Sequence, residues 1–169
     1  MTEAANDRNV KLKSGSRKKL AVMGVLILGL VGAVKLSPYQ LKMTMTESVD
    51  HSVFIVNTGK AKDLKIGDYV SVLAPDDPMS GHEYVKLVAG LPGDEVKVEG
   101  RDVYVGGIYR GRAKPVSRDG RDLEVVKPGI IPKGEIYLFA PHIDSYDSRY
   151  LEIGTVPDAL ITGTAKPLL

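Results

Sequence analysis

The sequence predicts an all-β domain preceded by one membrane-spanning helix. Three observations support this fold class: an uncharged run at residues 20–34, the lack of any long 3.6-residue periodicity after residue 40, and short β-rich runs from residue 52 onward. Glycine and proline divide these runs at close spacing, which is typical of compact all-β domains. A chain of 169 residues is long enough for one domain with a modest core.

The composition excludes several classes of function. The chain has no cysteine, so it has no disulfide, no thiol nucleophile and no cysteine-based zinc site. Residues 1–19 carry a net charge of +4 and the remainder carries −2, and a slightly acidic body without a basic aromatic stripe argues against nucleic acid as a partner. No His-Glu-x-x-His motif and no glycine-rich phosphate loop occurs, so no metal and no cofactor is expected.

The N-terminal region predicts a membrane anchor. Residues 1–19 are polar and basic, so we expect a disordered tail that stays in the cytoplasm. The uncharged run that follows is short for a spanning helix, but Lys19 and Lys35 can extend their side chains outward, and the predicted span is 20–38. Two other interpretations remain open, a cleaved secretory signal with a cleavage site at 31–33, and a buried core helix.

Residues 39–169 predict the β-rich domain. The turn at 99–102 predicts a hairpin, and the polar stretch at 109–127 predicts an exposed loop or β-ribbon. The runs that we expect to be strands are residues 52–56, 69–73, 84–88, 95–98, 103–105, 123–126, 135–139 and 160–164.

Lys86 is the residue in this domain that points most directly to chemistry. It is a single lysine in the apolar strand at 84–88, with Tyr84 and Val88 as its neighbours on the same face. A lysine among apolar groups loses hydration, which lowers its pKa and allows it to act as a general base. The alternative is an edge-strand lysine that points into water.

Two stretches carry a family resemblance. Tyr-Val-Lys at 84–86, followed by Gly-Leu-Pro-Gly-Asp at 90–94, resembles the lysine box of the type I signal peptidases, a Ser/Lys family. The stretch 144–150, followed by Val-Pro at 156–157, resembles that family's C-terminal box. The resemblance implies a signal-peptidase-like β fold in which Ser145 hydrogen-bonds Lys86. It also implies that Asp147 and Arg149 pair with each other and support the site.

The candidate nucleophile lies in a third stretch, which resembles the serine box of the conjugative-transfer, TraF-like branch of the family. Thr46, Ser48 and the Val-Phe pair at 53–54 fit that box, whereas Asp50 and Ser52 stand where proline and glycine are expected. Ser48 is the predicted nucleophile and Ser52 the alternative. The resemblance also implies an oxyanion hole formed by the Ser48 N–H and the Thr46 hydroxyl. Plausible walls of the substrate pocket are Val49, Tyr84 and Val85.

A histidine triad is a weaker alternative, because His51, His82 and His142 lack a supporting motif. The prediction is therefore a serine endopeptidase with a single-pass anchor in a bacterial inner membrane and a periplasmic catalytic domain. Its partners would be the lipid bilayer and a secreted precursor with small residues before the cleavage site, such as a conjugative pilin. A housekeeping signal peptidase is one alternative function. Another is a catalytically inactive β-domain that serves as a scaffold subunit of a secretion or conjugation apparatus.

Overall fold

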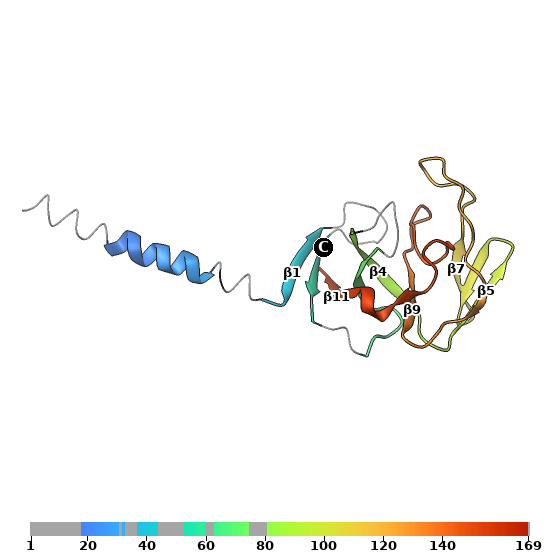
Figure 1. Cartoon of the computed structure of the whole chain (residues 1–169), viewed down its shortest axis with the longest axis horizontal. Coiled ribbons are helices and arrows are strands. Elements are labelled where there is room, and N and C mark those ends of the chain that lie inside the picture. Colours follow the sequence, from blue (N-terminus) through green and yellow to red (C-terminus); the bar gives the residue numbers. More distant parts are fainter. Residues whose placement is uncertain are drawn as a thin grey trace, which may run out of the picture. The chain divides into compact units, whose positions relative to one another are not determined.

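The computed structural model describes residues 18–30, 32, 37–43, 53–59, 63–74 and 81–168 (Figure 1). The chain divides into two compact units, Met1–Ser37 and Pro38–Leu169. The first unit contributes a helix, and the strands described below belong to the second unit. Each unit is described by itself.

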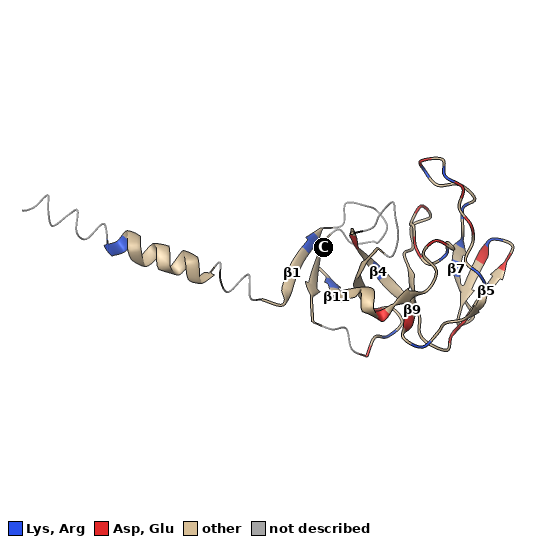
Figure 2. Cartoon of the chain, in the orientation of Figure 1, with Lys and Arg blue, Asp and Glu red and all other residues tan. Residues whose placement is uncertain are grey.

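The helix of the first unit includes residues 18–30 and 32. Its described part starts with Lys18 and Lys19, after which the described residues carry no charge (Figure 2). Its large apolar side chains are 53% to 73% exposed. No helix in the described part of the chain has the length and the hydropathy needed to cross a membrane. The anchor at 20–38 therefore stays a prediction, and residues 1–17 of the expected tail lie outside the described residues.

Seven strands of the second unit form an antiparallel sheet. In order across the sheet they are β1 (Tyr39–Met43), β2 (Val53–Asn57), β11 (Ile161–Pro167), β3 (Tyr69–Leu73), β4 (Glu83–Gly90), β9 (Glu135–Phe139) and β10 (Val156–Pro157). A short 3-10 helix, η1 (Asp158–Leu160), leads from β10 into β11. Because β11 lies between β2 and β3, the sheet brings together segments from both ends of this unit.

Four further strands form a smaller antiparallel sheet. Their order is β7 (Ile108–Arg112), β6 (Asp102–Val105), β5 (Glu95–Glu99) and β8 (Gly129–Ile130). β5 and β6 form the hairpin expected at 99–102, and Gly100 in its turn has a φ of +64°, a conformation that glycine adopts without strain.

The side chains of β4 are buried on both faces of the larger sheet. Val85 packs against a cluster that includes Phe54 and Ala140, whereas Val88 packs against a different cluster that includes Val70 and Leu138. The two valines differ in this way because alternate side chains of a strand point to opposite faces. Burial of each valine stabilises the folded state by roughly 1.5–3 kcal/mol. β4 therefore lies at the centre of the domain, which makes it a rigid support for any group that it carries.

Gly90 allows the two sheets to pack closely. A Cβ atom at this position would lie 2.5 Å from Val105 Cγ1 and 2.6 Å from Ile131 Cδ1, so a larger residue does not fit. The turn that follows is closed by Asp94, whose Oδ2 accepts the backbone N–H of Leu91 at 2.8 Å. The Gly-Leu-Pro-Gly-Asp segment thus redirects the chain from the larger sheet into the smaller one.

The predicted all-β class is confirmed. Seven of the expected runs correspond to strands, namely β2, β3, β4, β5, β6, β9 and β11. The ribbon expected at 109–127 is a strand only at its start, where β7 ends at Arg112. β1, β8 and β10 were not expected from the sequence.

The strand expected at 123–126 is wrong, because this segment forms an isolated bridge and no ladder. The carbonyl oxygen of Leu123 accepts a hydrogen bond from the guanidinium of Arg101 at 2.8 Å. The N–H of Val126 donates to the carbonyl oxygen of Arg149 at 2.9 Å. Leu123 and Val126 are buried as the pattern indicated, but their backbone groups bond to a side chain and a loop.

Candidate active site

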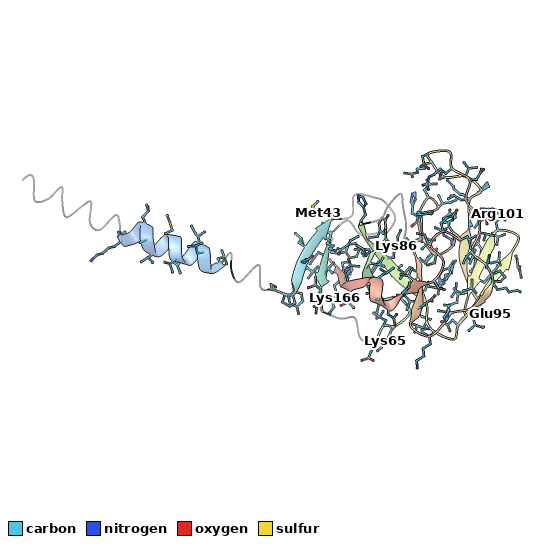
Figure 3. The ribbon with its side chains drawn as sticks, in the orientation of Figure 1. Met43, Lys65, Lys86, Glu95, Arg101 and Lys166 are labelled. Atoms are coloured by element: carbon cyan, nitrogen blue, oxygen red, sulfur yellow. The ribbon has the colours of Figure 1, made fainter. Side chains whose placement is uncertain are left out.

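Lys86 lies on β4 and is only 6% exposed (Figure 3). Its Nζ donates a hydrogen bond of 2.7 Å to Ser145 Oγ. The same Nζ lies 5.7 Å from the centre of the Tyr84 ring, and Val70 stands directly opposite Lys86 on β3. The amine is therefore buried beside an aromatic ring, and its hydrogen bond to the Ser145 hydroxyl fixes its orientation.

The surroundings of Lys86 change its acidity. Burial, which removes water from the charged ammonium, is the main reason that the pKa of Lys86 falls from 10.5 to about 8. The carboxylate of Asp147 acts in the opposite direction and raises this pKa, while the guanidinium of Arg149 lowers it. An amine with a pKa near 8 is partly neutral at physiological pH and can accept a proton there.

Asp147 and Arg149 form a buried ion pair close to this amine. Arg149 Nε lies 2.8 Å from Asp147 Oδ1, and Arg149 Nη2 lies 2.9 Å from Asp147 Oδ2. The two side chains are 0% and 2% exposed. A two-point pair of this kind fixes both groups in one plane, so the two buried charges compensate each other.

The guanidinium of Arg149 also organises the loop that carries Ser145. Its Nη2 donates to the carbonyl oxygen of Ser145 at 3.1 Å and to that of His142 at 3.2 Å. Asp147 Oδ2 accepts the N–H of Ala140 at 3.0 Å, which ties the same loop to the end of β9. The ion pair therefore positions the backbone of Ser145, and through it the hydroxyl that Lys86 contacts.

Comparison with known proteins identifies the family of the chain. A family model described as signal peptidase, peptidase S26, matches residues 16–169. The chain belongs to this signal peptidase family. The predicted recognition is thus confirmed, and the hydrogen bond and the ion pair that the resemblance implied are both present. The catalytic roles of these residues stay predictions.

Several relatives of this signal peptidase family member are conjugal transfer proteins. The conjugal transfer protein TraF of Agrobacterium fabrum strain C58 is 25% identical over 167 residues, which cover 88% of this chain and 89% of that protein. A probable conjugal transfer protein TraF from Sinorhizobium fredii is 28% identical over 169 residues, covering 89% and 87%. Among solved structures, a signal peptidase I from Enterococcus faecalis V583 is 21% identical and has a TM-score of 0.39. The match covers 61% of this chain and 97% of that chain.

The two described residues of the expected substrate pocket point to opposite faces of β4. Tyr84 lies on the Lys86 side, and burial raises the pKa of Tyr84 to about 12, with a further contribution from Tyr146. Val85 is 4% exposed and packs in the core cluster with Phe54. Tyr84 thus lies near the Lys86 amine, whereas Val85 lies on the opposite face of β4. Their roles as pocket walls stay predictions.

Most of the serine box of this signal peptidase family member lies outside the described residues, and its Val-Phe pair at 53–54 is described as the start of β2. The part outside includes the predicted nucleophile Ser48, Thr46 and Val49, and the alternative Ser52. β1 ends at Met43 and β2 begins at Val53, and these two residues are direct partners in the antiparallel register. The nucleophile, the oxyanion hole and the Val49 wall therefore stay predictions.

A polar cluster around Lys42 was not predicted from the sequence. Lys42 Nζ pairs with the carboxylate of Glu83 and donates to Ser71 Oγ at 3.0 Å. The Thr162 hydroxyl also donates to Ser71 Oγ, at 2.9 Å. The ion pair ties β1, which leads into the serine box, to the β4 strand that carries Lys86. The available signal was a lysine between the apolar residues Leu41 and Met43.

Proposed function

We propose that this chain is a serine endopeptidase in which Ser48 is the nucleophile and Lys86 the general base. The observation that carries the proposal is the buried amine of Lys86, which is 2.7 Å from Ser145 Oγ and has a pKa of about 8. A structural lysine at the surface would keep its hydration and its charge. A low pKa together with a fixed direction is what a lysine base requires.

The proposed reaction is acyl transfer by a Ser-Lys pair. Neutral Lys86 takes the proton of the Ser48 hydroxyl as Oγ bonds to the scissile carbonyl carbon, and the Ser48 N–H and the Thr46 hydroxyl bind the oxyanion. The C–N bond then breaks, and Lys86 returns the proton to the leaving amine. In the second half Lys86 takes a proton from water as the water oxygen attacks the ester carbon. The bond from that carbon to Ser48 Oγ then breaks, and Lys86 returns the proton to Oγ, which regenerates the Ser48 hydroxyl and the neutral amine.

The proposed substrate is a secreted precursor with small residues before the cleaved bond. An extended polypeptide would bind by adding a strand beside β4, with Tyr84 and Val49 as parts of shallow pockets. Relatives that are named conjugal transfer proteins support a client from a conjugation system, such as a pilin.

We also propose that residues 20–38 anchor the chain in a bacterial inner membrane, with the catalytic domain in the periplasm. Two features support a lipid partner. The large apolar side chains of the helix are exposed, and six basic residues precede the uncharged run. Basic residues on one flank favour the cytoplasm for that flank.

A small acylating probe directed at serine nucleophiles tests the proposed function. The full-length chain is expected to become acylated on Ser48, as identified by mass spectrometry of its peptides. Ser48→Ala and Lys86→Met are expected to show no acylation, whereas Ser52→Ala retains it, because loss of either member of a nucleophile–base pair removes most of the rate.

Other outcomes of the same experiment have clear meanings. Acylation of Ser52 in the Ser48→Ala variant would move the nucleophile to Ser52. A chain that is not acylated at all would favour the inactive scaffold, an alternative that the altered positions Asp50 and Ser52 keep open. Acylation of Lys86→Met at the normal rate would remove the lysine from the mechanism.

A further inference from the structure

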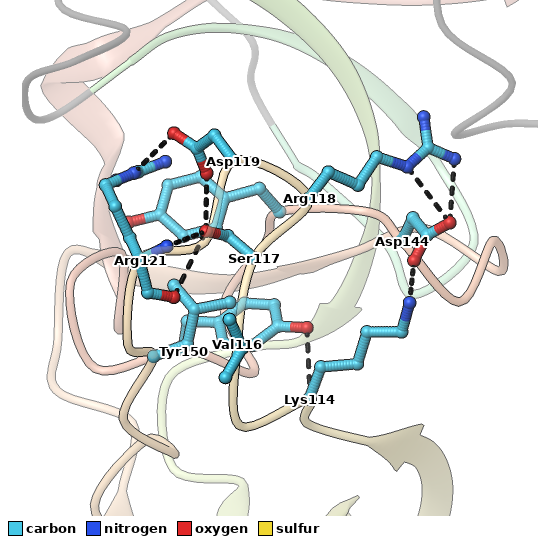
Figure 4. Close-up of a pocket in the computed structure, with 10 residues that line it drawn as sticks. Lys114, Val116, Ser117, Arg118, Asp119, Arg121, Asp144 and Tyr150 are labelled. Carbon is cyan, nitrogen blue, oxygen red and sulfur yellow. Dashed lines mark hydrogen bonds and ion pairs between the residues drawn. The ribbon is translucent and has the colours of Figure 1, made fainter.

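A second site lies beside the loop that carries Ser145. A pocket of about 410 Å³ is enclosed by two segments, residues 114–123 after β7 and residues 144–150 (Figure 4). The first segment is the polar stretch that the sequence marked as an exposed loop or ribbon. No role in the reaction proposed above falls on it.

Ion pairs join the two walls of this pocket. Arg118 donates to Asp144 Oδ2 from Nε at 3.1 Å and from Nη2 at 2.7 Å, and Lys114 Nζ pairs with Asp144 Oδ1. These hydrogen bonds, first that of Lys114 and then that of Arg118, lower the pKa of Asp144 to about 2. The carboxylate is therefore charged at physiological pH, so both ion pairs across the pocket persist there.

The 114–123 segment also has internal support. The N–H of Ser117 donates to the carbonyl oxygen of Arg121 at 2.9 Å, and the N–H of Arg121 donates back to Ser117 Oγ at 2.9 Å. Val116 and Asp122 form an antiparallel bridge. A loop with these cross-connections keeps its shape, so the pocket has a defined wall.

Apolar and aromatic side chains form part of the pocket lining. The rings of Tyr146 and Tyr150 are stacked with centroids 5.5 Å apart and an interplanar angle of 29°. Leu123 is buried, and Val116, which also lines the pocket, is 43% exposed. Apolar walls with charged groups at the edge are typical of ligand sites, and volumes of about 300–1,000 Å³ are usual for them.

The pocket shares the 144–150 loop with the surroundings of Lys86. Asp144 and Tyr146 line the pocket and flank Ser145, whose hydroxyl accepts the hydrogen bond from Lys86. Tyr84, whose ring lies beside the amine, is close enough to Tyr146 for the two phenols to affect each other's ionisation. A chain bound at Lys86 would therefore pass close to the pocket.

We propose that this pocket binds a large apolar or aromatic side chain of the precursor polypeptide, a few residues from the cleaved bond. The assignment rests on the proposed peptidase function, which supplies an extended chain that reaches both places. The volume exceeds what a small side chain fills. An anionic ligand fits less well, because Lys114 and Arg118 already pair with Asp144, and Arg121 pairs with Asp119.

The absence of cysteine from the chain allows a direct test. Val116→Cys introduces a single thiol at the pocket, and Ile130→Cys introduces one on β8, where the residue is 62% exposed and outside the pocket lining. Both are made in the full-length Lys86→Met chain, so that bound peptide is not consumed. The probes are fluorescent alanine- and serine-based peptides in which a single phenylalanine occupies each position in turn, with leucine, alanine and glutamate versions of the best peptide.

Binding is measured by fluorescence polarisation before and after alkylation of each thiol with a bulky maleimide. At one position of the peptide, we expect phenylalanine to give at least about tenfold tighter binding than alanine, which corresponds to about 1.4 kcal/mol. The leucine version of that peptide should bind with intermediate affinity. Alkylation of the thiol in the Val116→Cys variant is expected to abolish this preference. Alkylation of the thiol in the Ile130→Cys variant is expected to leave it intact. No phenylalanine preference, a preference for glutamate, or a preference that survives alkylation at Val116 would each overturn the proposal. Acylation of the unmodified chain decides the peptidase function separately.

Discussion

Arg149 and Asp147 face each other through two hydrogen bonds, of 2.8 and 2.9 Å, with both side chains almost fully removed from water. The same guanidinium binds the carbonyl oxygen of Ser145. Replacing both charges would remove the cost of burying them, whereas breaking the pair leaves one charge uncompensated in the interior. The pair therefore matters for stability and for the position of Ser145.

The first prediction concerns this pair. Arg149→Lys keeps the charge but loses the two-point geometry and the contacts to the loop carbonyls. We expect the free energy of unfolding, measured by urea titration, to fall by about 1–3 kcal/mol, because buried carbonyl and carboxylate oxygens lose their hydrogen-bond donor. The matched control is Arg112→Lys in the exposed pair with Asp102, where a change below about 1 kcal/mol is expected. Equal effects at the two sites would contradict the assigned role.

The second prediction concerns pH. The base must be neutral, and the pKa of Lys86 is about 8, so the cleavage rate should rise with pH through about 8 and then level off. Lys86→Arg should stay inactive at every pH tested, because a guanidinium is not deprotonated. A rate that is constant from about pH 6 to about pH 10 would show that this amine does not limit the reaction.

The third prediction concerns the stability cost of Lys86. The pKa of Lys86 is about 8 in the folded chain, below the unfolded value of about 10.4. Burial of the charged ammonium therefore lowers the free energy of unfolding by its full amount below pH 8, and this loss disappears as pH rises toward the unfolded pKa. The shift corresponds to roughly 3 kcal/mol at neutral pH, and loss of the Ser145 hydrogen bond offsets about 1 kcal/mol. Lys86→Met should therefore abolish cleavage with an unchanged or higher melting temperature.

The comparison for this variant is Lys97→Met. Lys97 is an exposed lysine that pairs with Glu99, with 62% of its side chain accessible, and its replacement should leave cleavage and melting close to normal. A Lys86→Met chain that melts far below the wild type would mean that the amine is mainly structural. A Lys86→Met chain that cleaves precursor normally would exclude Lys86 as the general base, and only the resemblance in fold to the family would stand.

The fourth prediction concerns Lys42 and Glu83. Their side chains are 20% and 34% exposed, so solvent screens the pair and its contribution is modest. In a double-mutant cycle of Lys42→Met and Glu83→Gln, urea unfolding should give a coupling free energy of about 0.5–1 kcal/mol. Strictly additive single effects would show that the two charges do not support each other.

The fifth prediction concerns topology. If residues 20–38 cross the membrane with the basic tail inside, a reporter fused after Leu169 should be active when it requires the periplasm. The same fusion should be silent with a reporter that requires the cytoplasm. The opposite pattern would place the peptidase domain on the cytoplasmic side.

Alternation and turn residues were sufficient to predict most strands, because a strand buried on one or both faces shows its pattern locally. β1 was not predicted because its apolar side chains are exposed and its lysine side chain is the one that makes contacts within the domain. Tyr39, Leu41 and Met43 are exposed, while Lys42 extends to Glu83 and Ser71. A lysine whose charge is paired with residues far away in the sequence cannot be distinguished from a surface lysine by the sequence alone.

The order of the strands was beyond the sequence for a different reason. The hydrogen bonds of Thr162 with Ser71 join residues 91 positions apart, and hydrophobic alternation does not specify such pairings. The contact of Lys86 with Ser145 was anticipated only because two motifs resembled boxes of one family. The pocket beside Ser145 was not anticipated, since its walls come from segments 30 positions apart that meet through Lys114 and Asp144.

The position of β11 between β2 and β3 determines when the larger sheet can close during biosynthesis. A nascent chain that has not yet released residues 161–167 cannot close the larger sheet, and contacts of such long sequence separation form late. Until then β3, which pairs with the β4 strand that carries Lys86, lacks its neighbour on the other side. A newly made chain therefore completes the sheet that supports Lys86 only after residues 161–167 have been inserted.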